Sequence, residues 1–305
     1  MDRNITEALK IPESVRVPLF GGLWYKWLCK LDNQTIRREQ LPENPLNTEA
    51  REEKVIVSLT SYPARIAYVH LAIKSLMLQS YKPDRIVLWL AEEQFPDKVL
   101  PKELVDLQRY GLEIRYGGNL FGHKKYFYAL QEQKNDELVV TYDDDIIYPP
   151  NSLKKLIETH QKYPKCIICN RAQALAFDSN GKVKNVGKWD TISEIGVKRA
   201  SFQLCPSTGG GCLYPSNALH TDFKNEKKIK DLALRADDPW IMFMAVSCGT
   251  PIIKTVKYHH SFTTIEQSQV EQLAQGNMVN NAYEVVLEKL IDAYPAAWER
   301  IRKGE

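Results

Sequence analysis

The pattern of apolar and polar positions changes at residue 54, where short apolar runs begin to alternate with amphipathic helical segments. The runs Lys54 to Thr60, Arg85 to Leu90 and Leu138 to Val140 have the length and content of buried strands. Between the first two, apolar side chains from Val69 to Met77 recur at helical spacing. Because strands that alternate with helices form βαβ units, this pattern predicts an α/β fold with a mostly parallel central sheet.

The regular alternation ends after Arg171, and a mixed region follows. Within it, the glycines of Ser207 to Gly211 predict a flexible loop, and Pro239 to Cys248 predicts a helix that ends at Gly249. The first half is therefore expected to bind a nucleotide, and the mixed region to hold another substrate.

Helical patterns flank this central part on both sides. One N-terminal helical face consists of Phe20, Leu23, Trp24, Trp27, Leu28 and Leu31, and a C-terminal one of Val286, Leu287, Leu290 and Ile291. We expect the second to pack as a closing brace. The first either packs on the parent domain or a partner, or makes a peripheral membrane contact through residues 19–31, since Trp and Lys are favoured at membrane interfaces. The chain thus divides into a helical extension (1–50), a central domain (51–262) and a helical tail (263–305).

The amino-acid composition says little about the class of protein. Hydrophobic residues make up 44% and charged residues 26% of the 305 positions, as in ordinary globular proteins. A net charge of +3 without a clustered basic run gives no reason to expect a nucleic-acid partner. No signal-peptide pattern or membrane-spanning run is visible, so we expect a cytoplasmic protein. The C-x-x-C pair Cys166 and Cys169 flanks two isoleucines and is expected to pack in the core.

The strongest chemical signal is the acidic triplet Asp143-Asp144-Asp145, directly after the apolar run Leu138 to Val140. In an extended chain Asp143 and Asp145 share one face, roughly 7 Å apart, and Asp144 points the other way. Adjacent carboxylates raise one another's pKa unless a cation neutralises them. Their position at the carboxyl end of a buried strand, where open α/β sheets bind ligands, predicts a site for Mg²⁺ or Mn²⁺ rather than a solvated turn.

Three segments in this order resemble a known family: Ser58 to Arg65, Thr141 to Asp145, and Arg235 to Trp240. They are similar to nucleotide-sugar glycosyltransferases of the GT-A fold, close to bacterial family 2 enzymes that build capsule, O-antigen or other surface glycans. The resemblance covers roughly residues 54–262. It implies a GT-A nucleotide-binding sandwich that moves a sugar from a nucleotide-diphosphate donor, expected to be UDP-linked, to a glycan or lipid-linked acceptor.

The resemblance also implies roles for the acids. Asp145 is the expected direct metal ligand, and Asp143 is expected to serve the ribose, the metal or a metal-bound water. Asp144 could have either role, metal ligand or ribose contact, because three adjacent acids leave the register of the D-x-D motif open. A late histidine often returns to the metal in such enzymes, which makes His259 or His260 a candidate third ligand.

Further residues are assigned to the nucleotide. These are Thr60, Tyr62, Arg65, Glu92, Lys124 and Lys125. The first three lie in the loop after the first strand, Glu92 follows the second strand as a partner for the base or ribose, and the two lysines are candidates for the pyrophosphate.

The acid pair Asp237-Asp238 matches the place where inverting enzymes of this kind carry the general base. We expect Asp238 to be the base, with Asp237 as the second candidate. Asp238 also precedes Pro239 and so suits a helix N-cap, and the two roles are compatible. Trp189, Trp240 and the loop at Gly209 to Gly211 are expected to form an acceptor-sugar surface, unless Trp240 belongs to the core.

Two other functions remain open from the sequence. A metal-dependent nucleotidyl or phosphoryl transferase would also need paired carboxylates, although the common glycine-rich phosphate-binding motifs are missing. A non-catalytic glycan-binding protein on the same fold is the other alternative, which the intact acids at both sites disfavour.

Overall fold

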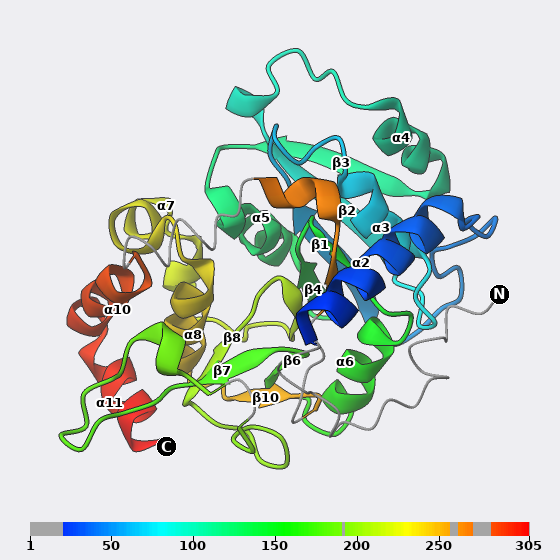
Figure 1. The fold of residues 1–305 in the computed structure, drawn as a ribbon. Coiled ribbons are helices and arrows are strands. Elements are labelled where there is room, and N and C mark those ends of the chain that lie inside the picture. The colour runs from blue at the N-terminus through cyan, green and yellow to red at the C-terminus, as the bar shows by residue number, and fades with distance from the viewer. Residues whose placement is uncertain (1–20, 191–192, 257–261, 271–281, 305) are drawn as a thin grey trace.

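The computed structural model describes residues 21–190, 193–256, 262–270 and 282–304. Over these ranges the chain forms a seven-stranded sheet with helices on both faces (Figure 1). In spatial order the strands are β10 (Ile252–Lys254), β6 (Ile167–Cys169), β9 (Gly210–Tyr214), β4 (Glu137–Tyr142), β1 (Lys54–Thr60), β2 (Arg85–Ala91) and β3 (Leu112–Gly117). Strand β9 runs antiparallel to both β4 and β6, whereas the other neighbouring pairs are parallel. The predicted α/β fold with a mostly parallel sheet is confirmed.

Two short ladders lie beside the main sheet. Strand β5 (Ile146–Ile147) pairs with β11 (Thr263–Thr264), and β7 (Ala172–Ala174) pairs with β8 (Leu204–Pro206). The helices are α2 (Gly21–Arg38), α3 (Val69–Met77), α4 (Lys102–Val105), α5 (Lys124–Glu132), α6 (Ser152–His160), α7 (Glu226–Lys228), α8 (Asp237–Cys248), α10 (Ala282–Ala293) and α11 (Pro295–Lys303). Short 3₁₀ turns connect several of them.

The sheet residues alternate between two hydrophobic cores, as the two-residue period of a strand requires. Val55 and Val57 of β1 face a core that contains α3 and α6, whereas Ile56 faces a core that contains α5, α8, α10 and α11. All six residues of β4 are buried, in agreement with its apolar sequence. Because both faces are covered, the open part of the sheet is its edge at the carboxyl ends of the parallel strands, which is where ligands bind in such folds.

The N-terminal helix α2 packs on this domain. Its side chains Cys29, Asn33 and Ile36 are buried, and the Asn33 amide donates a hydrogen bond of 2.8 Å to the carbonyl of Thr264 in β11. Ile36 joins a small apolar cluster with residues of α3 and β5. Of the two alternatives that the sequence left open for this helix, packing on the domain is therefore realised.

The opposite face of α2 carries the residues that suggested a membrane interface. Trp27 is 46% exposed, and Lys26 and Lys30 are exposed beside it. Phe20 and the side chains of Leu23 and Trp24 lie outside the described residues. Within the described ranges every helix is too short or too polar to span a bilayer. Peripheral membrane contact through residues 19–31 stays a prediction.

The C-terminal helices cover α8. Val286, Leu287 and Leu290 of α10 are buried against it, and Phe243 of α8 stacks on Trp298 of α11 with ring centroids 6.5 Å apart. The amphipathic brace predicted from the sequence is confirmed (Figure 1). Through this contact α10 brings its first turn next to the first turn of α8, which has a consequence for the site described below.

Candidate functional site

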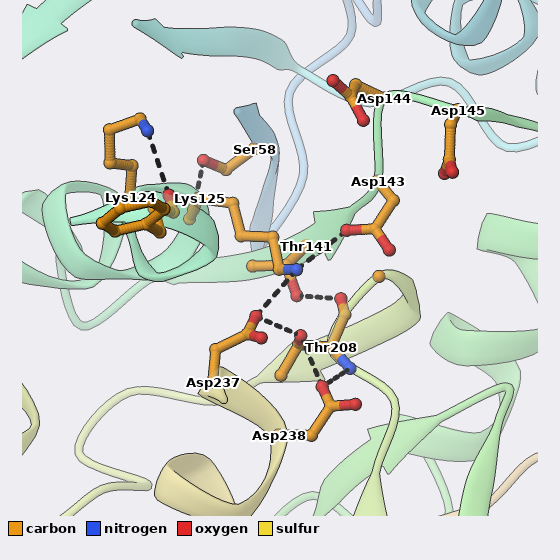
Figure 2. A network of polar contacts seen from close by, with 12 residues as sticks. Ser58, Lys124, Lys125, Thr141, Asp143, Asp144, Asp145, Thr208, Asp237 and Asp238 are labelled. Atoms are coloured by element: carbon orange, nitrogen blue, oxygen red, sulfur yellow. Dashed lines mark hydrogen bonds and ion pairs between the residues drawn. The ribbon is translucent and has the colours of Figure 1, made fainter. Parts of the chain in front are cut away.

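The three carboxylates of the triplet diverge at the end of β4. Asp144 is buried and accepts hydrogen bonds from Ser61 Oγ at 2.6 Å and from an Arg65 guanidinium nitrogen at 2.9 Å. The same nitrogen lies 3.0 Å from Asp145 Oδ2. Asp143 turns toward Lys125 instead, and Figure 2 shows the Asp144 carboxylate directed away from that lysine. The expectation that Asp144 points the other way from Asp143 agrees with this geometry.

The loop before β9 packs against Asp143 through Gly209. The Asp143 amide donates to the Gly209 carbonyl at 3.1 Å and to the Tyr148 hydroxyl at 2.8 Å. A Cβ atom at position 209 would lie 1.7 Å from Asp143 Oδ2, so only glycine allows the carboxylate its place. Gly210 and Gly211 belong to the buried strand β9, and the predicted flexible loop is therefore wrong for these two residues because they lie inside the main sheet.

Lys125, in the first turn of α5, connects the triplet with the second acidic motif. Its side chain is 5% exposed, and its ammonium lies 2.8 Å from Asp143 Oδ1 and 2.8 Å from Asp237 Oδ2. Burial by itself lowers the pKa of Lys125, but attraction to Asp143, Asp237 and Asp238 outweighs burial and raises the pKa well above its usual value. Lys125 is therefore a permanently charged centre between the two motifs (Figure 2).

The neighbouring Lys124 has a different environment. Its ammonium donates to the carbonyl of Phe121 at 3.0 Å and approaches the Asn119 side chain at 3.5 Å. Burial lowers the pKa of Lys124 to about 8, although the field of Asp144 and Glu93 opposes that shift. Of the two lysines assigned to the pyrophosphate, Lys125 is thus engaged by carboxylates, and Lys124 is bonded to neutral oxygens.

The acid pair lies at the beginning of α8. The helix begins at Asp237, and its N-cap is Ala236, which has no capping side chain. The prediction of Asp238 as the N-cap is therefore wrong, because the helix starts one residue before it. Both acids instead lie in the first turn, where the positive end of the helix dipole favours negative charge.

Asp238 is held from two sides. One oxygen accepts the Thr208 amide at 2.8 Å and lies 2.7 Å from the Thr208 hydroxyl, and the other accepts the Tyr283 hydroxyl at 3.1 Å. The Thr208 hydroxyl also lies 2.7 Å from Asp237 Oδ2. Tyr283 belongs to the first turn of α10, which the packing of α10 on α8 brings here. The sequence analysis did not identify Thr208 or Tyr283. Thr208 lies in the glycine-rich segment that was predicted as a loop, whereas no motif surrounds Tyr283.

The pKa values of Asp237 and Asp238 are shifted in opposite directions. Burial and the negative charge of Asp237 raise the pKa of Asp238 to about 6, in spite of Lys125 and the Thr208 donors. Burial also acts on Asp237, but Lys125 and His123 outweigh it and hold the pKa of Asp237 well below its usual range. A carboxylate pair whose pKa values are separated by its surroundings is typical of sites that move protons.

The other residues assigned to the nucleotide lie at the same edge of the sheet. Thr60 ends β1 and donates from Oγ1 to the carbonyl of Trp89 at 2.8 Å. Tyr62 is half-buried, with the Arg65 guanidinium 5.5 Å from its ring centre. Glu92 is exposed in the 3₁₀ turn that follows β2. His259 and His260 lie outside the described residues, so their assignment as metal ligands stays a prediction.

The two tryptophans that the sequence assigned to an acceptor surface are largely enclosed. Trp240 is fully buried in α8, and Trp189 is 6% exposed. Both belong to the core between the sheet and the C-terminal helices, so the core alternative is realised for Trp240, and Trp189 presents only a small part of its surface. Cys166 and Cys169 are buried free thiols, which confirms the expected core packing of the C-x-x-C pair.

A divalent ion would find a limited donor set here. Among the described residues no group of three or more histidine, cysteine or acidic side chains is arranged to hold a metal. Mg²⁺ and Mn²⁺, however, commonly use one or two protein carboxylates and complete their coordination with phosphate oxygens and water. Asp143 and Asp145 are 40% and 17% exposed and supply such a set, whereas Asp144 is enclosed by Ser61 and Arg65.

Comparison with known proteins adds a likeness in fold. No protein-family model matches the sequence, and no curated protein matches it. Among solved structures the chain is similar to 4-diphosphocytidyl-2C-methyl-D-erythritol synthase from Anaerococcus prevotii, with 14% identity over 76% of this chain and 99% of that one and a TM-score of 0.44. It is also similar to a mannosyltransferase from Pyrobaculum calidifontis, solved with GDP-mannose and Mn²⁺, with 11% identity over 77% of this chain and 64% of that one and a TM-score of 0.39. The likeness extends to the general fold only, so the site is interpreted from its own geometry.

The role of Lys125 leads to a prediction about stability. Lys125→Met should lower the free energy of unfolding by about 1–3 kcal/mol at pH 7.5, because it leaves the partly buried carboxylates of Asp143 and Asp237 without their cation. Lys124→Met is the matched control: it removes an adjacent buried lysine that has no carboxylate bonded to it, and it should cost clearly less. Urea unfolding followed by circular dichroism measures both, and equal losses in the two variants would contradict a central role for the Lys125 pairs.

Proposed function

We propose that the protein is a metal-dependent glycosyltransferase that uses a nucleotide-diphosphate sugar. The observation that carries the proposal is the network Asp143–Lys125–Asp237, which joins two acidic motifs about ninety residues apart in the sequence. One motif has carboxylates suited to a metal-bound diphosphate, and the other has a carboxylate with a raised pKa. A donor site and a proton-accepting group side by side are what sugar transfer to a hydroxyl requires.

The charge of the site supports metal dependence. Five carboxylates, in the triplet and the acid pair, lie with three cationic side chains, Lys124, Lys125 and Arg65. A diphosphate that arrives without a cation would meet a net negative site, and electrostatic repulsion would weaken its binding. When bound to Asp145 and Asp143, Mn²⁺ or Mg²⁺ would neutralise the diphosphate and stabilise the charge on the leaving group.

We assign the remaining donor contacts as the resemblance implies. Thr60, Tyr62 and Glu92 at the ends of β1 and β2 would contact the nucleoside, and Lys124 would approach the diphosphate. In this proposal Asp144 and Arg65 act together: the buried Arg65 holds Asp144 and Asp145 in place, and Asp145 keeps the more exposed position for the ion.

Asp238 is the proposed general base. It accepts the proton of an acceptor hydroxyl as that oxygen bonds to the anomeric carbon, while the bond from the same carbon to the diphosphate breaks and the nucleoside diphosphate leaves. Asp237 remains ionised beside Lys125 and keeps that lysine in position. Attack opposite to the leaving group would invert the anomeric configuration. The acceptor class remains a glycan or a lipid-linked glycan.

The function is tested by the products released. Purified protein should convert one of a panel of UDP-, GDP- and dTDP-sugars to the nucleoside diphosphate in the presence of Mn²⁺, and EDTA or Asp145→Ala should abolish the reaction. A parallel assay with nucleoside triphosphates and sugar 1-phosphates tests the alternative function, a nucleotidyltransferase. Release of pyrophosphate in that assay, with no diphosphate from any nucleotide sugar, would instead establish a nucleotidyltransferase.

The pKa of Asp238 leads to a second expectation. Transfer should fall about tenfold per pH unit below about pH 6, because the base is then protonated. Asp238→Asn should lower kcat by roughly 10²–10⁴ and retain donor binding. The pKa of Asp238 is higher in the folded protein than its value of about 3.9 in the unfolded chain. Protonated Asp238 therefore contributes stability that is fully present below about pH 4 and is lost as the pH rises through about 6. Asp238→Asn should therefore not lower Tm at pH 8.

The measurements are a pH–rate profile and thermal unfolding at pH 5 and pH 8. Asp237→Asn is the comparison variant, and it should lower Tm because it removes a partner of the buried Lys125. Unchanged kcat for Asp238→Asn with a good acceptor would remove this residue from the mechanism.

The Tyr283 contact predicts a shift of the same profile. Tyr283→Phe removes a donor to the ionised Asp238 and should move the acidic limb up by roughly one pH unit, with the donor KM unchanged. Tyr294→Phe removes an equivalent hydroxyl, which donates to Asp222 at 3.0 Å away from the site, and should leave the profile in place. If the pH–rate profiles of both variants coincide with that of the wild type, Tyr283 does not influence the pKa of Asp238.

A further inference from the structure

A cavity of about 250 Å³ lies along the C-terminal brace. One wall is a face of α10 from Tyr283 through Glu284, Leu287 and Glu288 to Ile291, and the opposite wall is formed by residues 181–186 and Trp189. Ile291 is eight positions after Tyr283, and at a rise of 1.5 Å per residue this wall is roughly 12 Å long. The volume is slightly below the roughly 300–1,000 Å³ of common small-molecule sites. The cavity therefore suits a short extended molecule.

The cavity is connected to the candidate base through Tyr283. Tyr283, which lines one end, is the residue whose hydroxyl donates to Asp238 at 3.1 Å. Trp298 of α11 is also a lining residue. A molecule that lies along this cavity would thus have one end at Tyr283, whose hydroxyl contacts Asp238, and would extend from there along α10.

The lining chemistry favours sugar rings. Trp298 contributes part of its aromatic ring to the lining, and the carboxylates of Glu284 and Glu288 can accept hydrogen bonds from hydroxyl groups. Lys182 and Lys184 on the opposite wall balance the two acids, so the lining has no net charge that would select a phosphate or a strongly ionic chain. The opposite wall is fixed in place, because the Val186 amide donates to Glu284 at 3.3 Å and the Trp189 indole donates to the Lys184 carbonyl at 2.8 Å.

We propose that this cavity binds the acceptor as an extended, uncharged oligosaccharide, with the sugar that is modified at the Tyr283 end. The proposal rests on the glycosyltransferase function and makes it more specific. It predicts an enzyme that elongates a sugar chain rather than one that modifies a free monosaccharide or an anionic lipid headgroup, and it predicts that affinity rises with the number of acceptor sugars that the cavity can contact.

A bulky side chain placed in the cavity tests this proposal. Glu288 is exposed and lines the cavity, and Glu288→Trp would fill it. Val285→Trp is the matched control, since Val285 is 49% exposed on the same helix and does not line the cavity. The probes are neutral methyl glycosides from mono- to tetrasaccharides, whose binding is measured by saturation-transfer NMR, and each variant is also assayed for hydrolysis of the nucleotide sugar by water.

We expect the wild type and Val285→Trp to bind the longer probes more tightly than the monosaccharides, and Glu288→Trp to bind them at least about tenfold more weakly, a loss of about 1.4 kcal/mol. Hydrolysis of the donor should be the same in all three proteins. Equal binding of long probes by Glu288→Trp and the wild type, no binding to the wild type, or equal losses in both variants would overturn the cavity proposal. Absence of donor hydrolysis in the wild type would count against the proposed transferase instead, and the NMR comparison would still decide on the cavity.

Discussion

The site depends on one buried ammonium group. Taking the charge of Lys125 out of water is costly, and the cost is recovered only because Asp143 and Asp237 lie within 2.8 Å of it. The reverse also holds, since these carboxylates come close together only around a cation. Each motif therefore requires the other, and the ion pairs fix the end of β4 relative to the beginning of α8. The geometry of the candidate site and the local stability therefore come from the same contacts.

The sheet topology makes this meeting feasible. The antiparallel strand β9 lies directly beside β4, so the loop that precedes β9 runs past the end of β4. That loop carries Thr208, which bonds to the acid pair, and Gly209, whose missing side chain leaves room for Asp143. A parallel strand at this position would enter the sheet from the opposite end and would place its preceding loop at the far edge. The one reversal in the central part of the sheet is thus what joins the two halves of the site.

Sequence reasoning recovered what depends on local pattern and missed what depends on packing. The α/β alternation, the strand before the triplet and the amphipathic C-terminal brace follow from hydrophobic periodicity, which is a local property. The start of α8 at Asp237, rather than after it, depends on the loop around Ala236 and could not be read from the proline signal. Tyr283 reaches Asp238 only because α10 packs on α8, and one sequence carries no signal for such a long-range contact. Trp189 and Trp240 show the same limit, since an aromatic residue looks alike in sequence whether it binds sugar or fills a core.

The acid pair shows how adjacent, chemically identical residues acquire different properties. Asp237 faces Lys125 and His123 and is held ionised, whereas Asp238 faces away from them toward Thr208 and Tyr283 and lies in the field of its neighbour. The helical backbone produces this division, because successive side chains in the first turn of α8 point in directions about 100° apart. Burial and the charge of Asp237 make the ionised Asp238 less favourable than a carboxylate in water, so its affinity for a proton near neutral pH is raised. The packing of α8 and α10 in the core, which includes the buried Trp240 and Leu290, holds the first turns of the two helices together and so keeps Asp238 in this environment.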